Sequence, residues 1–254
     1  MNSDDVIEKK KKIVLKMAKI FDKVCVENNI DYSLTAGSVL GAVRHKGFIP
    51  WDYDMDVVVP VDQFELMRTK LKEAINDKGY VLHEWDKEKK YYEVVDRLCP
   101  ANVPHQEVHL DIFPLIGAPN KRKKQVRFAK KCFYTFRILR CKNCDTNYSK
   151  KNHVKKIKMI KFFVWPIPDK AIIAWYHHLQ NKYKLSDVNF THRLASGYGL
   201  AEIQNKEVFL DTKRVPFEDT KLSIPKKAVD YLIKIYGDDY MTPKRDGYKI
   251  MDKK

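Results

Sequence analysis

The sequence predicts an α+β fold of mixed α/β character, in which a small mixed sheet is flanked by helices. Stretches with strand-like and with helical spacing alternate up to residue 118. A segment rich in lysine and arginine then continues with helical spacing, and the C-terminal half is again largely helical in pattern. The 254 residues support one good hydrophobic core with an added lobe. We therefore expect a core at 1–118, a basic and mostly helical insertion at 119–168, and a helical or irregular part at 169–254 that completes the same domain.

The first half contains the clearest alternation. Residues 4–28 place apolar side chains on one stripe of a helix and lysines on the other faces. The elements predicted after it are a strand at 30–36, a short helix at 39–43, a strand that begins at Asp52, a helix at 61–76, and strands at 80–84, 91–98 and 107–113. Pro114 is expected to close the last strand, because proline removes a ladder hydrogen bond.

The second half is less regular. Pro166 and Pro168 end the basic helical segment. A helix at 169–183, short irregular strands and loops at 198–217, and a last helix at 226–236 are expected to follow.

Composition limits where the protein works. No apolar run reaches the roughly 18 residues of a membrane-spanning helix, and the charged first twelve residues lack the apolar core of a secretory signal. Five cysteines, an odd number, argue against a fully paired disulfide framework. We expect a cytoplasmic protein, with a peripheral position at the inner face of a membrane as an open alternative.

Three acids at alternating positions stand out. Asp52, Asp54 and Asp56 run directly into three valines, and in a strand they would share one face. Such massed charge opposes folding unless a cation neutralises it, and carboxylate oxygens suit a divalent cation. The segment therefore predicts a metal site and phosphate chemistry. An exposed strand edge that resists aggregation is the alternative.

A third carboxylate on a neighbouring strand would complete such a site. Asp111 lies in an apolar run, where a buried charge is costly without a partner, and His109 shares its face. We predict that Asp54, Asp56 and Asp111 are the metal ligands. Asp111 accepting a proton from an attacking hydroxyl is a second role that the sequence leaves open. Asp52 is expected to stand behind the ligands.

A phosphate cradle is predicted upstream. Gly37 and Ser38 lie at a strand-to-helix turn, where backbone N–H groups favour anions. Arg44 and His45 follow on the way to the acids, and they are candidates to hold the remaining phosphate charge. Trp51, at the entrance to the acidic strand, is a candidate for the substrate-binding wall.

In this order, the turn and the acids resemble the hG[GS]…[DE]h[DE]h…h[DE]h pattern of the nucleotidyltransferase superfamily. The run TAGSVLGAVRHKGFIPWD at 35–52 is similar to the signature of the LicD family, which includes bacterial phosphocholine transferases and to which the fukutins are related. Later stretches agree with that family, namely 92–98, 109–114, 215–218 and 232–243. The family usually reads Trp-Asp-Asp-Asp-Ile-Asp where this chain has Tyr53 and Met55, and both changes fall on the face opposite the acids.

The resemblance implies a nucleotidyltransferase-like core and an activity. Mg²⁺ or Mn²⁺ would be held by the three acids, and a phospho-substituted alcohol would pass from a CDP-activated donor to a hydroxyl of a cell-surface glycan precursor, free or lipid-linked, with release of CMP. Phosphocholine is the head group favoured on family grounds, while glycerol and ribitol donors fit the metal site equally well. A cage of aromatic side chains would bind the quaternary ammonium of choline. The candidates for that cage are Trp51, Tyr53, Trp85, Tyr91, Tyr92 and Trp175.

Two other functions compete with this one. The first is a nucleotidyltransferase that moves NMP onto a small acceptor, and the second is a basic protein that binds RNA or another anionic polymer. The competition arises from residues 120–161, which hold sixteen Lys or Arg and one acid and so account for nearly all of the net charge of +16. A solvated helical pair, an anionic membrane surface and a phosphate-bearing acceptor are the readings we favour for this segment, ahead of nucleic acid.

Cysteine spacing raises one further possibility. Cys132, Cys141, Cys144 and His153 would make a Cys₃His zinc site. A single Cys-x₂-Cys clip with scattered partners is weak evidence, so we expect free thiols and no zinc.

Overall fold

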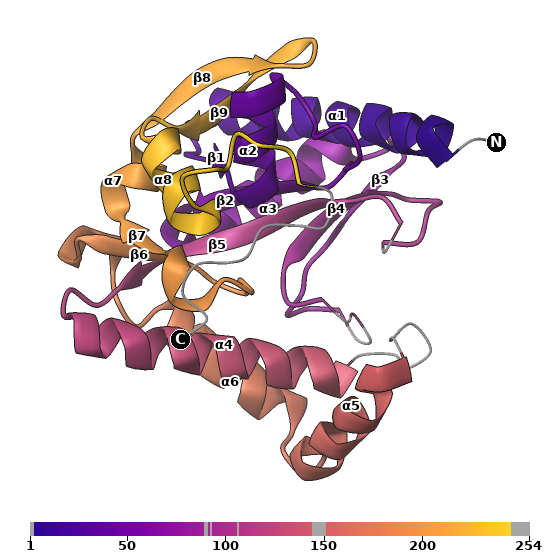
Figure 1. Cartoon of the computed structure of the whole chain (residues 1–254). Coiled ribbons are helices and arrows are strands. Elements are labelled where there is room, and N and C mark those ends of the chain that lie inside the picture. The colour runs from indigo at the N-terminus through magenta and orange to yellow at the C-terminus, as the bar shows by residue number, and fades with distance from the viewer. Residues whose placement is uncertain (1–2, 89–90, 92, 106, 144–150, 245–254) are drawn as a thin grey trace.

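The structure is a computed structural model, and it describes residues 3–88, 91, 93–105, 107–143 and 151–244. Its centre is a mixed sheet with the strand order β1-β2-β5-β4-β3, from which β6 and β7 continue beside β5 (Figure 1). The strands are β1 (Ser33–Leu34), β2 (Met55–Pro60), β3 (Tyr80–His83), β4 (Asp96–Pro100), β5 (Leu110–Ala118), β6 (Phe190–Arg193) and β7 (Ile203–Asn205). β2 and β5 run parallel, and the other neighbouring pairs run antiparallel. The predicted mixed sheet is confirmed.

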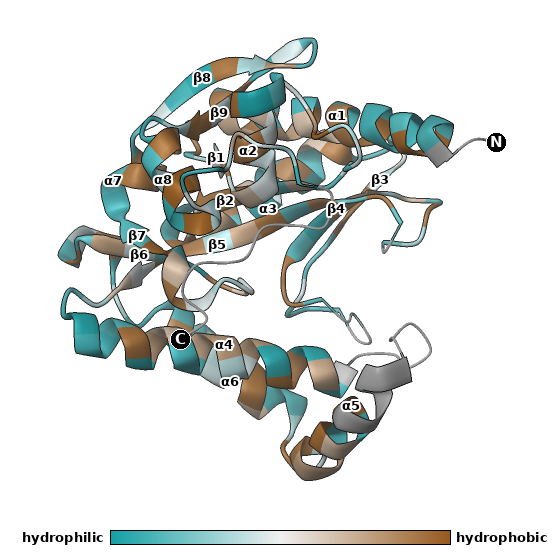
Figure 2. Cartoon of the chain, viewed as in Figure 1, coloured by the Kyte–Doolittle hydropathy of each residue, from teal (hydrophilic) through white to brown (hydrophobic). Residues whose placement is uncertain are grey.

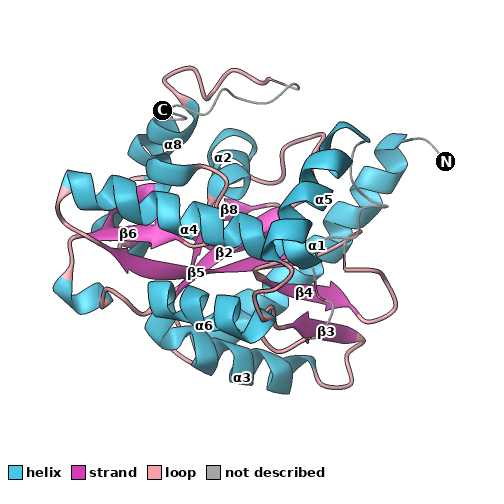
Figure 3. Ribbon diagram, turned by 90° about the horizontal axis from the view of Figure 1, so that it is seen from below, coloured by secondary structure: helices cyan, strands magenta, loops and turns pink. Residues whose placement is uncertain are grey.

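Helices flank this sheet on both sides, as predicted. α1, α2 and α8 lie on one side, while α4, α5 and α6 form a layer on the other (Figures 1 and 3). The helices are α1 (Ser3–Glu27), α2 (Ala36–His45), α3 (Phe64–Ile75), α4 (Arg122–Asn143), α5 (Lys151–Val164), α6 (Asp169–Gln180), α7 (Lys206–Leu210) and α8 (Ala228–Tyr236). A separate hairpin of β8 (Thr212–Phe217) and β9 (Thr220–Pro225) packs against β1 and α2. The basic segment is helical, as expected.

Two hydrophobic clusters hold these layers together. The main core joins the sheet to α1, α2, α3 and α8, and the predicted apolar stripe of α1 is buried in it. A smaller cluster, centred on the fully buried Tyr176, joins α4 and α6 to β5 and β6. The basic layer is therefore attached to the sheet by apolar packing of its own. Among the described residues, no helix is both long enough and apolar enough to cross a bilayer.

The boundaries around the acids differ from the prediction. β2 begins at Met55, so Asp52 and Asp54 lie in the loop before it and only Asp56 is a strand residue. The prediction that the three acids share one strand face is therefore wrong, because pairing with β5 starts only at Met55. β1 ends at Leu34 and α2 begins at Ala36, so the Gly-Ser pair lies in the first helical turn.

β5 is longer than predicted. Pro114 lies inside it, and the strand continues to Ala118. β5 pairs with β4 as far as Ile112 and with β6 from Leu115 onward, so Pro114 falls between the two partners. On the side of β5 that faces β4 and β6, residue 114 is paired with neither strand, so the backbone N–H that proline lacks is not needed there. The limits of β4 also differ from the prediction, because this strand begins at Asp96 and not at residue 91.

The C-terminal part contributes strands as well as helices to the fold. β6 and β7 add to the main sheet, although the sequence predicts no strand at Phe190–Arg193. The last helix ends at Tyr236, as predicted, and Gly237 directly after it adopts a φ of 90° that other residues rarely adopt.

Candidate active site

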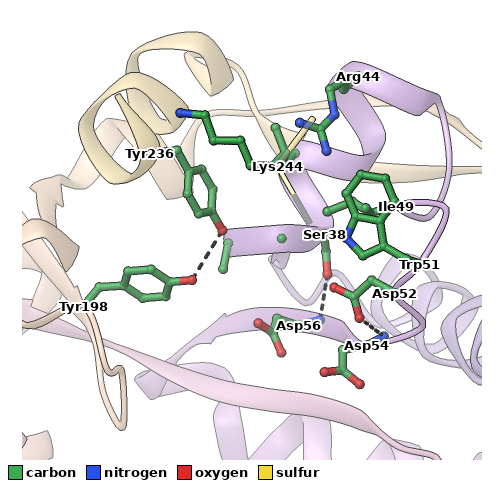
Figure 4. A pocket seen from close by; sticks show the side chains of 13 residues that line it. Ser38, Arg44, Ile49, Trp51, Asp52, Asp54, Asp56, Tyr198, Tyr236 and Lys244 are labelled. Atoms are coloured by element: carbon green, nitrogen blue, oxygen red, sulfur yellow. Dashed lines mark hydrogen bonds between the residues drawn. The ribbon is translucent and has the colours of Figure 1, made fainter. Parts of the chain in front are cut away.

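A cavity of about 480 Å³ opens beside the start of β2 (Figure 4). It brings together all of the predicted site residues except His45 and Asp111. The residues that line it are Ala36, Gly37, Ser38, Leu40, Arg44, Ile49, Trp51, Asp52, Asp54, Asp56, Tyr198, Tyr236 and Lys244. The wall thus combines a helix start, an acidic loop and two segments from the far end of the chain.

The turn at the start of α2 has an unusual backbone conformation. Ala36 has a φ of 48°, in the left-handed region that a residue with a side chain rarely adopts. Its N–H donates to the hydroxyl of Tyr231 at 3.0 Å, and the hydroxyl of Thr35 lies 2.9 Å from the same oxygen. Tyr231 is fully buried on α8. The last helix therefore fixes the turn at the start of α2, the positive end of the helix, which favours a phosphate.

Ser38 connects this turn to the acids. Its hydroxyl oxygen accepts a hydrogen bond from the Asp56 N–H at 2.8 Å, while the Asp56 carbonyl accepts one from the Thr35 N–H at 3.0 Å. In the preceding loop, the Asp54 N–H donates to the Asp52 carboxylate at 3.2 Å (Figure 4). Asp52 therefore shapes the loop that presents Asp54, and all three acids reach the cavity although only one of them belongs to the strand.

Ionising Asp54 and Asp56 in this cavity is costly. Desolvation raises the pKa of Asp54 to about 6, and the negative charges of Asp52 and Asp111 add to the rise. Desolvation also raises the pKa of Asp56 to about 7, against the opposing effect of Arg193. A cation bound between Asp54 and Asp56 would stabilise their ionised forms.

Asp111 lies next to this pair but has a partner of its own. It pairs directly with Asp56 across the parallel strands β2 and β5. Its carboxylate accepts a hydrogen bond from Arg97 Nε at 2.7 Å, and His109 Nε2 lies 3.7 Å away. Burial lowers the pKa of His109, which favours a neutral ring. The positive charge that Asp111 requires is thus supplied by Arg97 on β4.

The donor set fits a hard divalent cation that is shared with a substrate. Mg²⁺ is usually bound through one or two carboxylates together with substrate phosphates. Asp54 and Asp56 supply two carboxylates to one cavity. Within the described parts of the chain, no three His, Cys, Asp or Glu side chains are grouped as a ready-made metal site. The metal site made of Asp54, Asp56 and Asp111 therefore stays a prediction, with Asp54 and Asp56 in the cavity and Asp111 on the neighbouring strand.

Arg193, at the end of β6, is a charged residue next to the site that the sequence did not predict. Its guanidinium lies 2.7 Å from the carboxylate of Glu202 and 3.5 Å from that of Asp56, and it stacks over the ring of Phe113 at 4.6 Å. Arg193 and Glu202 are both buried. Arg193 therefore provides a fixed positive charge behind the acidic pair. Arg193 ends the short strand Phe190–Arg193, and no motif or spacing around it predicts this role from the sequence.

Arg44 and His45 are both predicted to bind phosphate, but only Arg44 lines the cavity. Arg44 lines the cavity, and its Nη1 donates to the Tyr240 carbonyl at 2.9 Å. Arg44 Nε donates to His45 Nε2 at 2.8 Å, so His45 supports the arginine from outside the cavity. Lys244 adds a second basic side chain to the same wall.

Three aromatic side chains line the cavity. They are Trp51, Tyr198 and Tyr236, and the two tyrosine hydroxyls lie 3.4 Å apart. Of these three, only Trp51 is predicted from the sequence. Among the described residues, the other predicted cage residues do not line the cavity: Tyr53 contacts Lys10, Trp85 and Tyr91 are buried in a hydrophobic cluster, and Trp175 lies on α6. Tyr92 lies outside the described residues.

A second cavity, of about 490 Å³, lies against the basic helix α4 and shares Tyr198 with the first. One face of α4 supplies Lys130, Phe133, Tyr134 and Arg137 to its wall, and the other wall is the loop 197–200. Cationic and aromatic side chains together suit an anionic glycan, because rings stack on sugar faces and the cations pair with phosphate or carboxylate.

The possible zinc ligands do not form a site among the described residues. Cys132 is buried and Cys141 is partly buried, and neither forms a disulfide there. Burial raises the pKa of the Cys132 thiol to about 12, which disfavours the thiolate that zinc requires. Cys144 lies outside the described residues, as does the side chain of His153.

Comparison with known proteins gives a match to one family model and matches to individual relatives. Residues 29–139 match the family model described as LicD/FKTN/FKRP, nucleotidyltransferase domain. Over 250 residues the chain is 25% identical to the lipopolysaccharide cholinephosphotransferase LicD of Haemophilus influenzae, an alignment that covers 93% of this chain and 92% of that protein. It is also 34% identical over 62 residues to the ribitol 5-phosphate transferase FKRP of Homo sapiens, covering 23% of this chain and 12% of that protein.

Proposed function

Residues 29–139 carry the nucleotidyltransferase domain of the LicD family, and from this premise we propose that the protein is a metal-dependent phosphotransferase. It moves phosphocholine, or a related phospho-alcohol, from a CDP-activated donor to a hydroxyl of a cell-surface glycan precursor and releases CMP. One observation supports this proposal most: the same cavity is lined by the start of helix α2 and by two carboxylates whose pKa values are raised. A pyrophosphate ester needs both kinds of group.

Each side chain then has a part in the transfer. Asp54 and Asp56 would hold Mg²⁺ or Mn²⁺, which supplies positive charge to the pyrophosphate when bound. The first turn of α2 and Arg44 steady the phosphate that stays with CMP. The acceptor hydroxyl attacks the phosphorus that bears the alcohol, and the bond from that phosphorus to the CMP oxygen breaks. Asp111 is positioned one strand away, where it either receives the hydroxyl proton or completes the metal site.

Choline is the head group that we favour. Trp51, Tyr198 and Tyr236 line the cavity, and aromatic faces attract a quaternary ammonium by up to about 2 kcal/mol when it is desolvated. The relative that aligns over most of the chain is a cholinephosphotransferase, whereas the ribitol 5-phosphate transferase aligns over a short stretch. Ribitol or glycerol donors are the alternative.

The test is to incubate the protein with CDP-choline, CDP-glycerol and CDP-ribitol in turn, with Mg²⁺ and a glycan acceptor such as lipopolysaccharide, and to measure CMP. We expect CMP release from CDP-choline that EDTA abolishes. Release of pyrophosphate from a nucleoside triphosphate instead would indicate a nucleotidyltransferase. No release from any donor, together with tight RNA binding, would indicate a binding protein.

Metal binding should depend on pH in a defined direction. Raised pKa values mean that, without metal, ionising Asp54 and Asp56 costs stability as the pH rises through about 6 and about 7. Mg²⁺ should therefore raise the melting temperature little at a pH below this window and clearly above it. Differential scanning fluorimetry on both sides of the window measures this. An equal effect of Mg²⁺ at both pH values, or an effect that survives in Asp54→Asn/Asp56→Asn, would count against the site.

The second cavity is our proposed acceptor site. Lys130→Glu/Arg137→Glu should raise KM for an anionic glycan acceptor about tenfold and leave KM for the donor unchanged. Lys123→Glu/Lys124→Glu is the matched control, since it changes the charge of the same helix equally at exposed residues outside the cavity. If both variants change the acceptor KM equally, general charge rather than this cavity governs binding.

A further inference from the structure

The end of α5 exposes an unusual set of apolar side chains. Phe162, Phe163 and Trp165 are 77%, 71% and 80% exposed, and Met159 and Ile167 are exposed beside them. We call these five side chains the aromatic patch. Figure 2 shows hydrophobic residues along this end of α5, at the outer end of the helical layer. Isolated exposed apolar residues are common, but large aromatic side chains clustered on one short segment mark a binding surface.

The patch is built on ordered backbone. The Trp165 N–H donates to the Lys161 carbonyl at 2.8 Å, and the Ile167 N–H donates to the Val164 carbonyl at 3.1 Å. Val164 is buried, so one residue anchors the segment while its neighbours point outward. The ammonium of Lys142 on α4 contacts the Ile167 carbonyl and lies 2.8 Å from the Asp169 carboxylate. The exposure therefore belongs to a turn that is fastened to α4.

Positive charge surrounds the patch. Lys158 and Lys170 are exposed on either side of it. The sequence contains six lysines and no acid between residues 146 and 168. Asp169, the first acid that follows, is paired with Lys142. Exposed aromatic side chains with exposed lysines beside them match the interface of an anionic bilayer, where rings lie among the headgroups and lysines pair with the phosphates.

An apolar cavity of about 240 Å³ adjoins the patch. It lies between α4 and α6, and its lining is Thr135, Ile138, Ile167, Ala171, Ile172 and Trp175. Ile167 belongs to both the patch and the cavity. A lipid chain beside the inserted rings would find an apolar surface there.

We propose that the aromatic patch inserts into the interface of an anionic phospholipid bilayer and holds the protein at the membrane surface. From the sequence, a membrane contact is predicted at 120–161, where basic residues alternate with aromatic ones, whereas the exposed apolar side chains of the patch lie mostly beyond it, at 159–167. Insertion of side chains is a different mode of binding from charge attraction, because the rings contribute apolar burial that salt does not screen. This inference does not depend on the reaction proposed above.

Vesicle co-sedimentation tests it without any donor or acceptor. The full chain should bind vesicles of equimolar phosphatidylcholine and phosphatidylglycerol, and it should bind pure phosphatidylcholine more weakly. Phe162→Ser/Phe163→Ser should lower the apparent partition constant at least about tenfold. Val26→Ser/Val229→Ser, at exposed apolar residues of α1 and α8 outside the patch, should stay within about twofold of the native protein. Lys158→Glu/Lys170→Glu should remove the preference for anionic vesicles.

A second readout reports insertion directly. Brominated phosphatidylcholine in the same vesicles should quench tryptophan fluorescence, and Trp165→Phe should abolish most of the quenching. The proposal is overturned if the native protein stays in the supernatant with both vesicle types, or if the Phe162→Ser/Phe163→Ser variant binds as the native protein does. It is also overturned if gel filtration shows a dimer that this variant dissociates while vesicle binding is unchanged, since the patch would then join two copies. Circular dichroism melts check that each variant is folded.

Discussion

Replacing Asp56 or Asp54 with asparagine is expected to lower the rate of CMP release at saturating donor at least about 10³-fold, or roughly 4 kcal/mol in the barrier. These two carboxylates face the cavity, and an amide supplies neither their charge nor their affinity for a cation. The measurement is CMP release at saturating CDP-choline and Mg²⁺. Asp230→Asn, at an exposed aspartate of α8, is the matched control and should keep the native rate.

The same substitutions should not destabilise the protein. The raised pKa values show that the folded protein carries these charges at a cost near neutral pH. The Asp54→Asn variant should therefore melt at or above the native temperature in the absence of metal, while its turnover collapses. This divergence is the signature of a residue retained for its chemistry. Native turnover in either variant would exclude the proposed metal site, and a lower melting temperature would indicate a structural role.

Replacing Arg193 with methionine is expected to lower the free energy of unfolding by about 3–5 kcal/mol. Glu202 is fully buried, and its carboxylate would then lie in the core without the cation that is now 2.7 Å away. Urea denaturation with a fitted m-value measures this loss. The double variant Arg193→Met/Glu202→Gln should recover most of the lost stability, because it leaves no uncompensated charge.

An exposed ion pair provides the comparison for this variant. Lys226 and Asp211 are 3.2 Å apart and largely exposed, so Lys226→Met should cost less than about 1 kcal/mol. If Arg193→Met costs as little, the ion pair with Glu202 contributes nothing that a methionine does not replace. Arg193→Met should also slow CMP release, because Asp56 would lose the charge that favours its ionised form.

The local pattern of apolar and polar residues predicted most of the helices. The stripe of α1, the spacing of α3 and the glycine that ends α8 are short-range signals, and the structure agrees with each of them. The strands were harder, because their limits depend on which partner is present. β2 begins where β5 meets it, which leaves Asp54 outside the strand, and Pro114 is tolerated because β5 changes partner there.

The site divides in the same way. Gly37, Ser38, Asp54 and Asp56 are close in sequence, and their spacing was enough to predict that they work together. Arg193, Tyr198, Tyr231 and Tyr236 come from the last quarter of the chain, and they reach the cavity or its turn because β6 and α8 pack beside β5 and α2. The local pattern of residues along the chain does not predict such long-range contacts.

The sequence by itself determined which residue types can form the proposed site: a glycine and a serine at a turn that suits phosphate, and alternating acids that suit a divalent cation. Only the tertiary structure decided how the alternating acids are used. Asp56 is held in a strand by Ser38, Asp54 is presented from a loop shaped by Asp52, and Asp111 is paired with Arg97. The physical reason is that burial and neighbouring charges set the state of a carboxylate, and both depend on segments brought together by folding.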